Sequence, residues 1–200
     1  MAKTAFRVVV AMGLVAVGLA GTEPAAFGAS ARHAKVITLM VLIDNDPGVP
    51  VNILEPAKET VTRVFQQIDV EILWLGRGDT RLENLAFRGS VMTVHLLTRE
   101  MADRMHAPDA LLGLAVSGTG LATVFYNRIE GSSSTRDASD IACLLGHVIA
   151  HEMGHLLLPL HAHSLSGIMQ AGLNMQLAAR GGLFFTASQA HQIRTKITAD

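Results

Sequence analysis

The sequence predicts an α+β fold: a twisted, mixed β-sheet of about four to five strands with an N-terminal helix, a long central helix and a C-terminal helix. Three observations lead to this prediction. Residues 35–75 have a strand–helix–strand order, further β-rich runs follow between residues 90 and 129, and a long apolar helical stretch ends at Pro159. We expect these segments to form one domain over residues 32–200.

The first strand–helix–strand unit is marked by a change of hydrophobic period. Residues 35–43 (KVITLMVLI) are a continuous β-branched and aliphatic run, typical of a buried strand, and the DNDPG sequence after them favours a turn. Between residues 53 and 68 the apolar side chains recur with the period of a helix, and residues 70–75 (VEILWL) form the next predicted strand. This order favours two parallel strands joined by a right-handed crossover.

The middle of the chain predicts three more strands. Residues 76–89 are polar and bounded by glycines, so we expect a loop, and we interpret its Arg-Gly-Asp tripeptide as turn chemistry. Residues 90–98 form a predicted strand in which His95 has a structural role, and residues 99–109 a short helix and its connection. Residues 111–118 and 121–129 are expected to be the last two strands.

Two helices complete the predicted fold. A serine-rich loop at residues 130–140 can supply the N-cap of a helix over about 139–158, which ends before Pro159 because a residue that precedes proline is disfavoured in the α region. Near the C-terminus, Thr186 or Ser188 can cap a final helix. That helix would carry apolar residues on one side: Ala190, Ile193 and Ile197.

The N-terminus predicts a secretory signal peptide over residues 1–31. Lys3 and Arg7 precede an uncharged apolar run at residues 8–20, and small residues follow. The run is shorter than the roughly 20 residues of a transmembrane helix. We therefore expect cleavage between residues 20 and 31, a secreted or periplasmic protein, and no stable membrane insertion after cleavage.

Charge and cysteine content exclude some classes of protein. Residues 1–31 carry two basic residues and one acidic residue, so the remaining chain has 14 basic and 16 acidic residues and a net charge of −2. The sequence lacks the basic patch of a nucleic-acid-binding protein, and no nucleic-acid partner is expected. Cys143 is the only cysteine, so the chain cannot form an intramolecular disulfide.

The predicted central helix contains the pattern H-E-x-x-H at residues 151–155. Residues four apart lie on the same face of a helix, so His151 and His155 can bind one metal ion. Glu152 lies one step around the helix, where it can hold and deprotonate a metal-bound water as the catalytic base. This pattern predicts a Zn²⁺ site. His147, one turn earlier, is interpreted as a residue that supports a metal ligand from behind or lies at the surface.

The third metal ligand is left open by the sequence. Residues 156–200 contain no glutamate, so the candidates are His161, His163 and, more remotely, His191. His161 stands ten residues after His151, as in the pattern H-E-x-x-H-x-x-G-x-x-H. Leu158 occupies the glycine position of that pattern and Pro159 follows it. The helix is therefore expected to break one residue later than in that pattern, and His163 becomes a second geometric candidate.

The chain resembles the metzincin zinc peptidases. More closely, it is similar to a group of uncharacterised secreted bacterial proteins in which a helix ending in HExGHLLL is followed by HSxxGIM. The likeness extends over most of residues 32–200, including VFQQIDVEILWL, ATVFYNRI and FTASQAHQIR. It implies a metzincin-like domain, Met169 as the Met-turn residue, and His163 rather than His161 as the third ligand. It also implies that residues 111–116 pair with an extended substrate.

Two departures from the metzincin pattern are visible: the glycine is absent, and Gln170 rather than a tyrosine follows Met169. The expected function is a zinc-dependent metalloendopeptidase that hydrolyses peptide or protein substrates by Glu-assisted attack of zinc-bound water. The alternatives are a catalytically inactive zinc-bound binding or structural domain, and a zinc amide hydrolase that acts on a non-peptide substrate.

Overall fold

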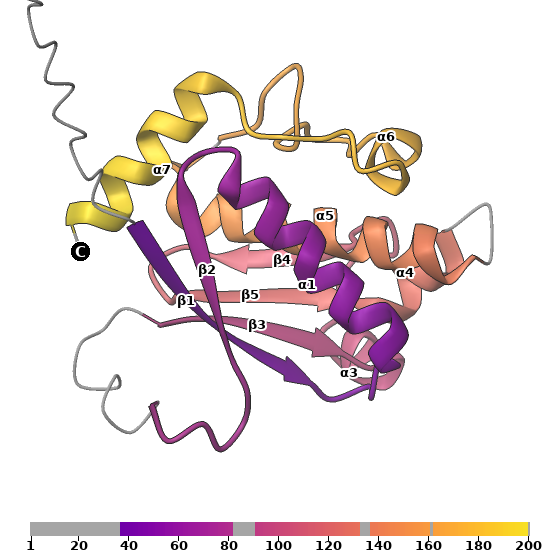
Figure 1. Cartoon of the computed structure of the whole chain (residues 1–200). Coiled ribbons are helices and arrows are strands. Elements are labelled where there is room, and N and C mark those ends of the chain that lie inside the picture. The colour runs from indigo at the N-terminus through magenta and orange to yellow at the C-terminus, as the bar shows by residue number, and fades with distance from the viewer. Residues whose placement is uncertain (1–36, 82–90, 133–136, 161, 200) are drawn as a thin grey trace, which may run out of the picture. The chain divides into compact units, whose positions relative to one another are not determined.

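The computed structural model describes residues 37–81, 91–132, 137–160 and 162–199. The predicted signal peptide and His161 lie outside these ranges. Within them the chain has an α+β fold with a five-stranded mixed sheet and helices, as expected from the sequence (Figure 1). None of the helices in the described part of the chain is long and apolar enough to cross a membrane.

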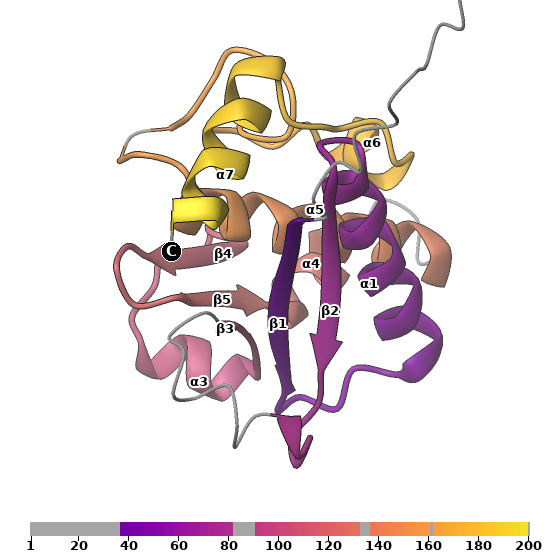
Figure 2. The ribbon, with the colours of Figure 1, turned by 60° about the vertical axis from the view of Figure 1, so that its left-hand side comes forward.

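The sheet has the strand order β2-β1-β3-β5-β4 (Figures 1 and 2). Strands β2, β1, β3 and β5 run parallel to one another, and β4 pairs antiparallel with β5 at one edge. The predicted parallel pairing of the first two strands is confirmed, with Leu39 opposite Ile72. The strands are β1 (Ile37–Asn45), β2 (Val70–Leu75), β3 (Val91–Leu97), β4 (Gly113–Val116) and β5 (Leu121–Phe125).

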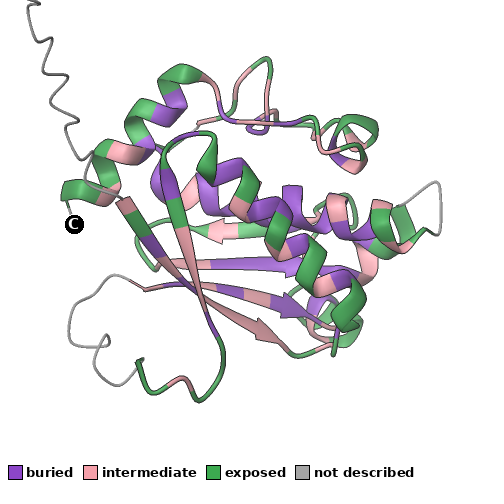
Figure 3. Ribbon diagram, viewed as in Figure 1, coloured by how far each residue is buried: buried purple, intermediate pink, exposed green. Residues whose placement is uncertain are grey.

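The two long helices α1 and α5 pack against each other and against the sheet (Figure 3). Helix α1 buries the apolar stripe that its sequence period predicts, including Ala57, Val61 and Phe65. Helix α5 is buried over most of its length, as its high content of apolar residues requires. The helices are α1 (Val51–Gln66), α3 (Arg99–Arg104), α4 (Tyr126–Ser132), α5 (Ala138–Leu157), α6 (Met175–Ala179) and α7 (Ala187–Ala199).

The ends of α5 and α7 follow local sequence rules. Asp137 caps α5 by accepting a hydrogen bond from the Ser139 N–H. Leu158 already has extended backbone angles (φ −101°, ψ 159°), so the helix ends immediately before Pro159 as predicted. At α7 the Thr186 hydroxyl accepts from the Gln189 N–H, and the Gln189 side chain accepts from the Thr186 N–H, which is a capping box.

Two segments differ from the sequence prediction. The strand expected over residues 121–129 ends at Phe125, and α4 follows at once. Tyr126 and Ile129 are both buried, and a helix places residues three apart on the same side, whereas a strand would place them on opposite faces. Helix α6 was not expected, because five residues are too few to show a helical period.

Candidate metal centre

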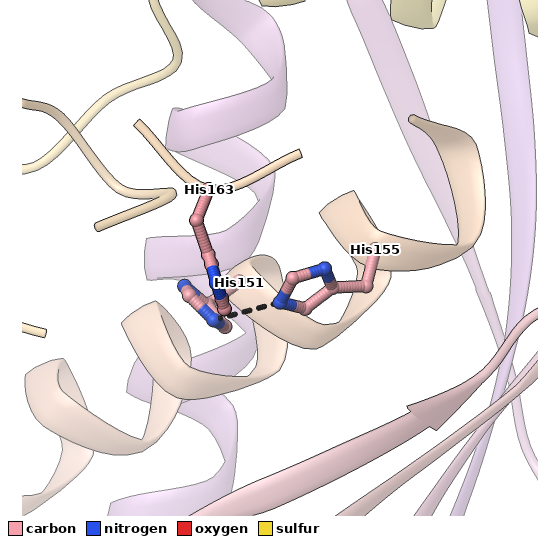
Figure 4. Close-up of side chains that lie close together, drawn as sticks. All are labelled: His151, His155 and His163. Carbon is pink, nitrogen blue, oxygen red and sulfur yellow. Dashed lines mark hydrogen bonds between the residues drawn. The ribbon is translucent and has the colours of Figure 1, made fainter. Parts of the chain in front are cut away.

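Three histidine side chains converge on one point between α5 and the segment that follows Pro159 (Figure 4). His151 and His155 lie one turn apart on α5, and their Nε2 atoms are 3.1 Å apart. The ring centroid of His163 is 5.6 Å from that of His151 and 4.7 Å from that of His155. One ring nitrogen of each histidine lies within 4.8 Å of the other two, so the three side chains could hold one metal ion.

The hydrogen bond of His151 leaves one of its nitrogens available to a metal. Its Nδ1 lies 2.7 Å from the Ile168 carbonyl oxygen, which can only accept, so Nδ1 carries the proton and donates. Nε2 of His151 therefore carries no proton. Its lone pair can accept the 3.1 Å hydrogen bond from His155 Nε2 in the metal-free protein, and could bind a metal ion in its place. A backbone carbonyl that fixes the outer nitrogen of a metal-binding imidazole is a common arrangement in zinc sites.

Burial keeps the two helix histidines neutral. It lowers the pKa of His155 to about 4, with smaller effects from the neighbouring His151 and His163 rings. The pKa of His151 is also lowered, mainly by burial, although its hydrogen bond to Ile168 acts in the opposite direction. Neutral imidazole is the form that binds a metal ion, so the donor set fits zinc near neutral pH.

Glu152 lies beside the histidines with only 7% of its surface exposed. It lines the same cleft as the three rings. In the metal-free protein burial raises its pKa to about 8, because little water remains to solvate the charged carboxylate. A cation held by the histidines would act in the opposite direction. The geometry therefore places a buried carboxyl group in the same cleft as the candidate metal site.

Met169 is fully buried and packs against α5 at Gly154, the residue before His155. A Cβ atom on Gly154 would lie 2.5 Å from the Met169 sulfur, so a larger residue at this position would have to displace the Met169 side chain. The backbone on both sides of Met169 is tied down. The Ser164 N–H donates to the Met169 carbonyl, and the Ile168 N–H donates to the Phe184 carbonyl. These bonds hold the segment that begins with His163.

His147 does not belong to the histidine group, and the interpretation of it as a surface residue is wrong. It is fully buried, and its Nδ1 donates to the Cys143 carbonyl oxygen at 2.8 Å. Burial is also the main reason that its pKa is lowered. A hydrogen bond to the preceding turn of its own helix makes His147 a core residue. The spacing of four residues from His151 indicates the position of His147 along the helix, but not how deeply that position is buried.

The candidate site opens into a cleft of about 670 Å³ between α5, the chain around β4, and residues 171–175. His151, Glu152, His155 and His163 all line this cleft. Strand β4 contributes Gly113, Leu114 and Ala115 to the opposite wall. The site is therefore accessible to a ligand, and an edge strand of the sheet lies alongside it.

A second group of possible ligands was missed by the sequence reasoning. Asp44 and Asp46 lie at the carboxyl end of β1, and His95 on β3 is in register with Asp44. The His95 Nε2 atom is 3.0 Å from Asp44 and 2.9 Å from Asp46. The Arg77 guanidinium contacts both carboxylates, so a cation already pairs with them. This arrangement favours an ion-pair cluster, which agrees with a structural role for His95.

No family model and no curated protein matches this sequence. Several solved structures do match in fold. One of them is a zinc-dependent peptidase from Methanocorpusculum labreanum, with a TM-score of 0.52 and 18% sequence identity. The match covers 78% of this chain and 99% of that one. The α+β fold described above is therefore similar to the fold of a zinc-dependent peptidase.

Proposed function

We propose that the protein is a zinc-dependent metalloendopeptidase, with His151, His155 and His163 as the metal ligands and Glu152 as the catalytic base. The main support is the approach of His163 to the His151–His155 pair at the edge of a cleft that also contains Glu152. The likeness in fold to a zinc-dependent peptidase supports the same function.

The three imidazoles would hold zinc with neutral nitrogen ligands, the donor set of many catalytic zinc sites. When bound, zinc supplies a Lewis acid that polarises the scissile carbonyl group and lowers the pKa of water. The hydrogen bond from His151 Nδ1 to the Ile168 carbonyl fixes the ring in the orientation that this role requires.

Glu152 would move the proton during hydrolysis. Its carboxylate accepts a proton from the attacking water as the new C–O bond forms at the scissile carbonyl carbon. It then donates that proton to the leaving nitrogen as the C–N bond breaks, so the products are a carboxylic acid and an amine. Burial of Glu152 favours the protonated carboxyl group and thus helps it to retain the proton between the two steps.

Strand β4 would bind the substrate backbone. It is an edge strand, and among the described residues its outer side has no strand partner. Unpaired N–H and C=O groups on such an edge can pair with an extended peptide. Gly113 of this strand lies in contact with Glu152, so a peptide paired with β4 would pass the catalytic base.

A zinc-bound domain without peptidase activity is the second candidate. Gln170 occupies the position after Met169, where the sequence departs from the metzincin pattern. Its side-chain amide donates to the Leu165 carbonyl oxygen at 2.7 Å. A group that assists the oxyanion in some metzincins is therefore missing at this position, and the Lewis acidity of zinc alone would have to stabilise the transition state.

The test compares zinc content and peptide cleavage in wild-type protein, Glu152→Ala and the control His191→Ala, which changes an exposed histidine on α7. We expect one zinc per chain in all three proteins, and cleavage of a mixed peptide library only by wild type and His191→Ala. Cleavage by Glu152→Ala would rule out the proposed mechanism. Stoichiometric zinc in a wild-type protein that cuts no peptide would favour the second candidate.

A further inference from the structure

The described residues that line the cleft beside the histidines carry few charged groups. Among the described residues that line it, the titratable side chains are His151, Glu152, His155 and His163 alone. Two serines, Ser117 and Ser132, are the other polar lining residues, and all the rest are apolar or glycine. The described lining therefore contains no lysine, arginine or aspartate that could pair with a charged ligand.

Several apolar side chains of the lining are exposed to water. Leu111 and Leu114 are each 39% exposed, and Leu160, just after Pro159, is 73% exposed. Large apolar side chains grouped around a concave surface are typical of ligand-binding sites, because a ligand that covers them removes apolar area from water. Leu173 and Met175 form a further part of the wall and pack against the core, which holds this part in place.

A charged substrate side chain would lose its hydration in this cleft and gain no partner. Glu152 is assigned to proton transfer and the three histidines to the metal, so none of them is free to pair with such a group. An apolar side chain would lose no hydrogen bond on entering and would cover the exposed leucines. The lining thus discriminates by charge.

We propose that the cleft selects extended peptides whose side chains beside the cleaved bond are uncharged and apolar. This inference rests on the proposed peptidase function, because it concerns the bond that is cleaved. The selection of apolar over charged side chains is nevertheless a property of binding. It can therefore be measured without turnover, in a protein whose catalytic base has been removed.

The experiment uses zinc-loaded Glu152→Gln and labelled peptides of one length with leucine, aspartate or lysine at the two central positions. Fluorescence anisotropy should show that the leucine peptide binds at least about tenfold more tightly than either charged peptide. Equal binding of the three peptides, tighter binding of a charged peptide, or no binding of any peptide would overturn the proposal.

Two arginine substitutions provide matched controls in the Glu152→Gln background. Leu160→Arg places a cation in the cleft, and we expect the affinity gap between the leucine and aspartate peptides to narrow by about threefold or more. Val51→Arg changes an equally exposed apolar residue (71%) at the start of α1, outside the cleft lining, and should leave the gap unchanged. If both variants reduce the affinity difference between the leucine and aspartate peptides equally, the effect comes from the net charge of the protein. The cleft would then not select peptides by charge.

Wild-type enzyme separates this inference from the proposed function. Cleavage of the leucine peptide with little cleavage of the charged peptides supports both. If the leucine peptide binds selectively but wild type cuts none of the three, the charge selection is upheld and the peptidase proposal fails. If wild type cuts all three peptides with similar kcat/KM, the peptidase proposal is upheld and the charge selection fails.

Discussion

Gly113 on β4 and Glu152 on α5 occupy adjoining space. A Cβ atom on Gly113 would lie 2.6 Å from the Glu152 Cγ atom and 2.7 Å from its Oε1 atom. Atoms that are not bonded to each other do not approach so closely. The Glu152 carboxylate can therefore occupy its present position only because residue 113 is a glycine and has no side chain. The edge strand proposed to bind substrate thus also determines where the proposed base can lie.

Gly113→Ala should therefore reduce catalysis more than stability. The new methyl group would displace the Glu152 carboxylate, and a displacement of about 1 Å can reduce the rate by on the order of 100-fold. The zinc ligands are untouched, so zinc content should stay at the wild-type value. The measurements are kcat on a cleavable peptide and metal content by mass spectrometry.

Gly76→Ala is the matched control for this substitution. A Cβ atom on Gly76 would meet nothing within 4 Å, and its backbone angles do not require glycine. The Gly76→Ala variant should retain wild-type kcat. If Gly113→Ala also retained wild-type kcat, Glu152 would not depend on the space at residue 113.

The choice of the third ligand gives the second prediction. His163→Ala should weaken zinc binding by about 100-fold or more, because even residues that only orient zinc ligands contribute 10- to 100-fold. His161→Ala should bind zinc as wild type does. Competition with a chromophoric zinc chelator measures both affinities. Loss of zinc binding in His161→Ala, with His163→Ala unchanged, would assign the ligand to His161.

Much of this fold could be predicted from local sequence patterns. The unit β1–α1–β2 was predicted because each segment has a clear hydrophobic period, and the end of α5 because Pro159 acts locally. The boundary between β5 and α4 was not predicted, because a short apolar run fits a buried strand and a helix equally well.

The site was only partly predictable, because some of its residues are positioned by local sequence and others by contacts with distant segments. His151, Glu152 and His155 belong to one helix, so their spacing fixes their relative positions. The position of His163 depends on how the chain runs after Pro159. Hydrogen bonds to distant segments hold that path, such as the one that the Ile168 N–H donates to the Phe184 carbonyl oxygen. The Asp44–His95–Arg77 cluster depends on the register between β1 and β3, and no local pattern specifies that register.

The packing of Met169 on Gly154 leads to a prediction about stability. Met169→Ala should lower the free energy of unfolding by about 2 to 5 kcal/mol, because the residue is fully buried and its removal leaves a cavity. Met169→Leu, which conserves volume, should cost less than about 1.5 kcal/mol. Urea denaturation of the metal-free proteins measures both. Equal losses in the two variants would mean that packing volume is not the main contribution of Met169.

Gly154→Ala tests the other side of this contact. Alanine is favoured over glycine in a helix by about 1 kcal/mol, but here its methyl group would overlap the Met169 sulfur. Overpacking of this kind costs about 1 to 3 kcal/mol, so the net effect should be destabilising. A Gly154→Ala variant that is more stable than wild type in urea would show that Met169 can move aside without loss.

Arg128 on α4 should affect substrate binding through the loop that leads to β4. Its guanidinium donates to the carbonyl oxygens of Pro108 and Leu111 at 2.7 and 2.8 Å and to that of Ala107 at 3.0 Å. Leu111 lines the cleft, so Arg128→Ala should raise KM by about five- to tenfold with a smaller change in kcat. Arg128→Lys should keep a similarly raised KM, because lysine lacks the planar guanidinium group that donates several hydrogen bonds at once.

Hydrogen exchange provides an independent measurement for Arg128. In Arg128→Ala the amides of residue 107 and residues 109–112 should exchange faster, whereas those of α5 should keep their wild-type protection. Faster exchange throughout α5 would indicate general destabilisation and would remove the positioning role from Arg128. This measurement needs no substrate, so it applies even if the peptidase proposal fails.

The raised pKa of Glu152 leads to a prediction for the stability of the metal-free protein. Burial raises this pKa from 4.5 in the unfolded chain to about 8 in the folded one. Below pH 4.5 the carboxyl group is protonated in both the folded and the unfolded state, so its ionisation does not change the free energy of unfolding. Between pH 4.5 and 8 the unfolded chain releases the proton and the folded protein keeps it, so stability falls as pH rises. Glu152→Gln cannot titrate and should lack this loss.

The stability advantage of Glu152→Gln over wild type should thus grow between pH 5 and 8, reaching on the order of a few kcal/mol, and level off above pH 8. His155 acts in the opposite sense, because its lowered pKa reduces stability as pH falls from 6.5 toward 4. It is present in both proteins, so its effect cancels in the difference. Urea denaturation with a chelator at pH 5, 6.5 and 8 measures that difference. A difference that stays constant with pH would show that Glu152 is as well solvated in the folded protein as in the unfolded chain.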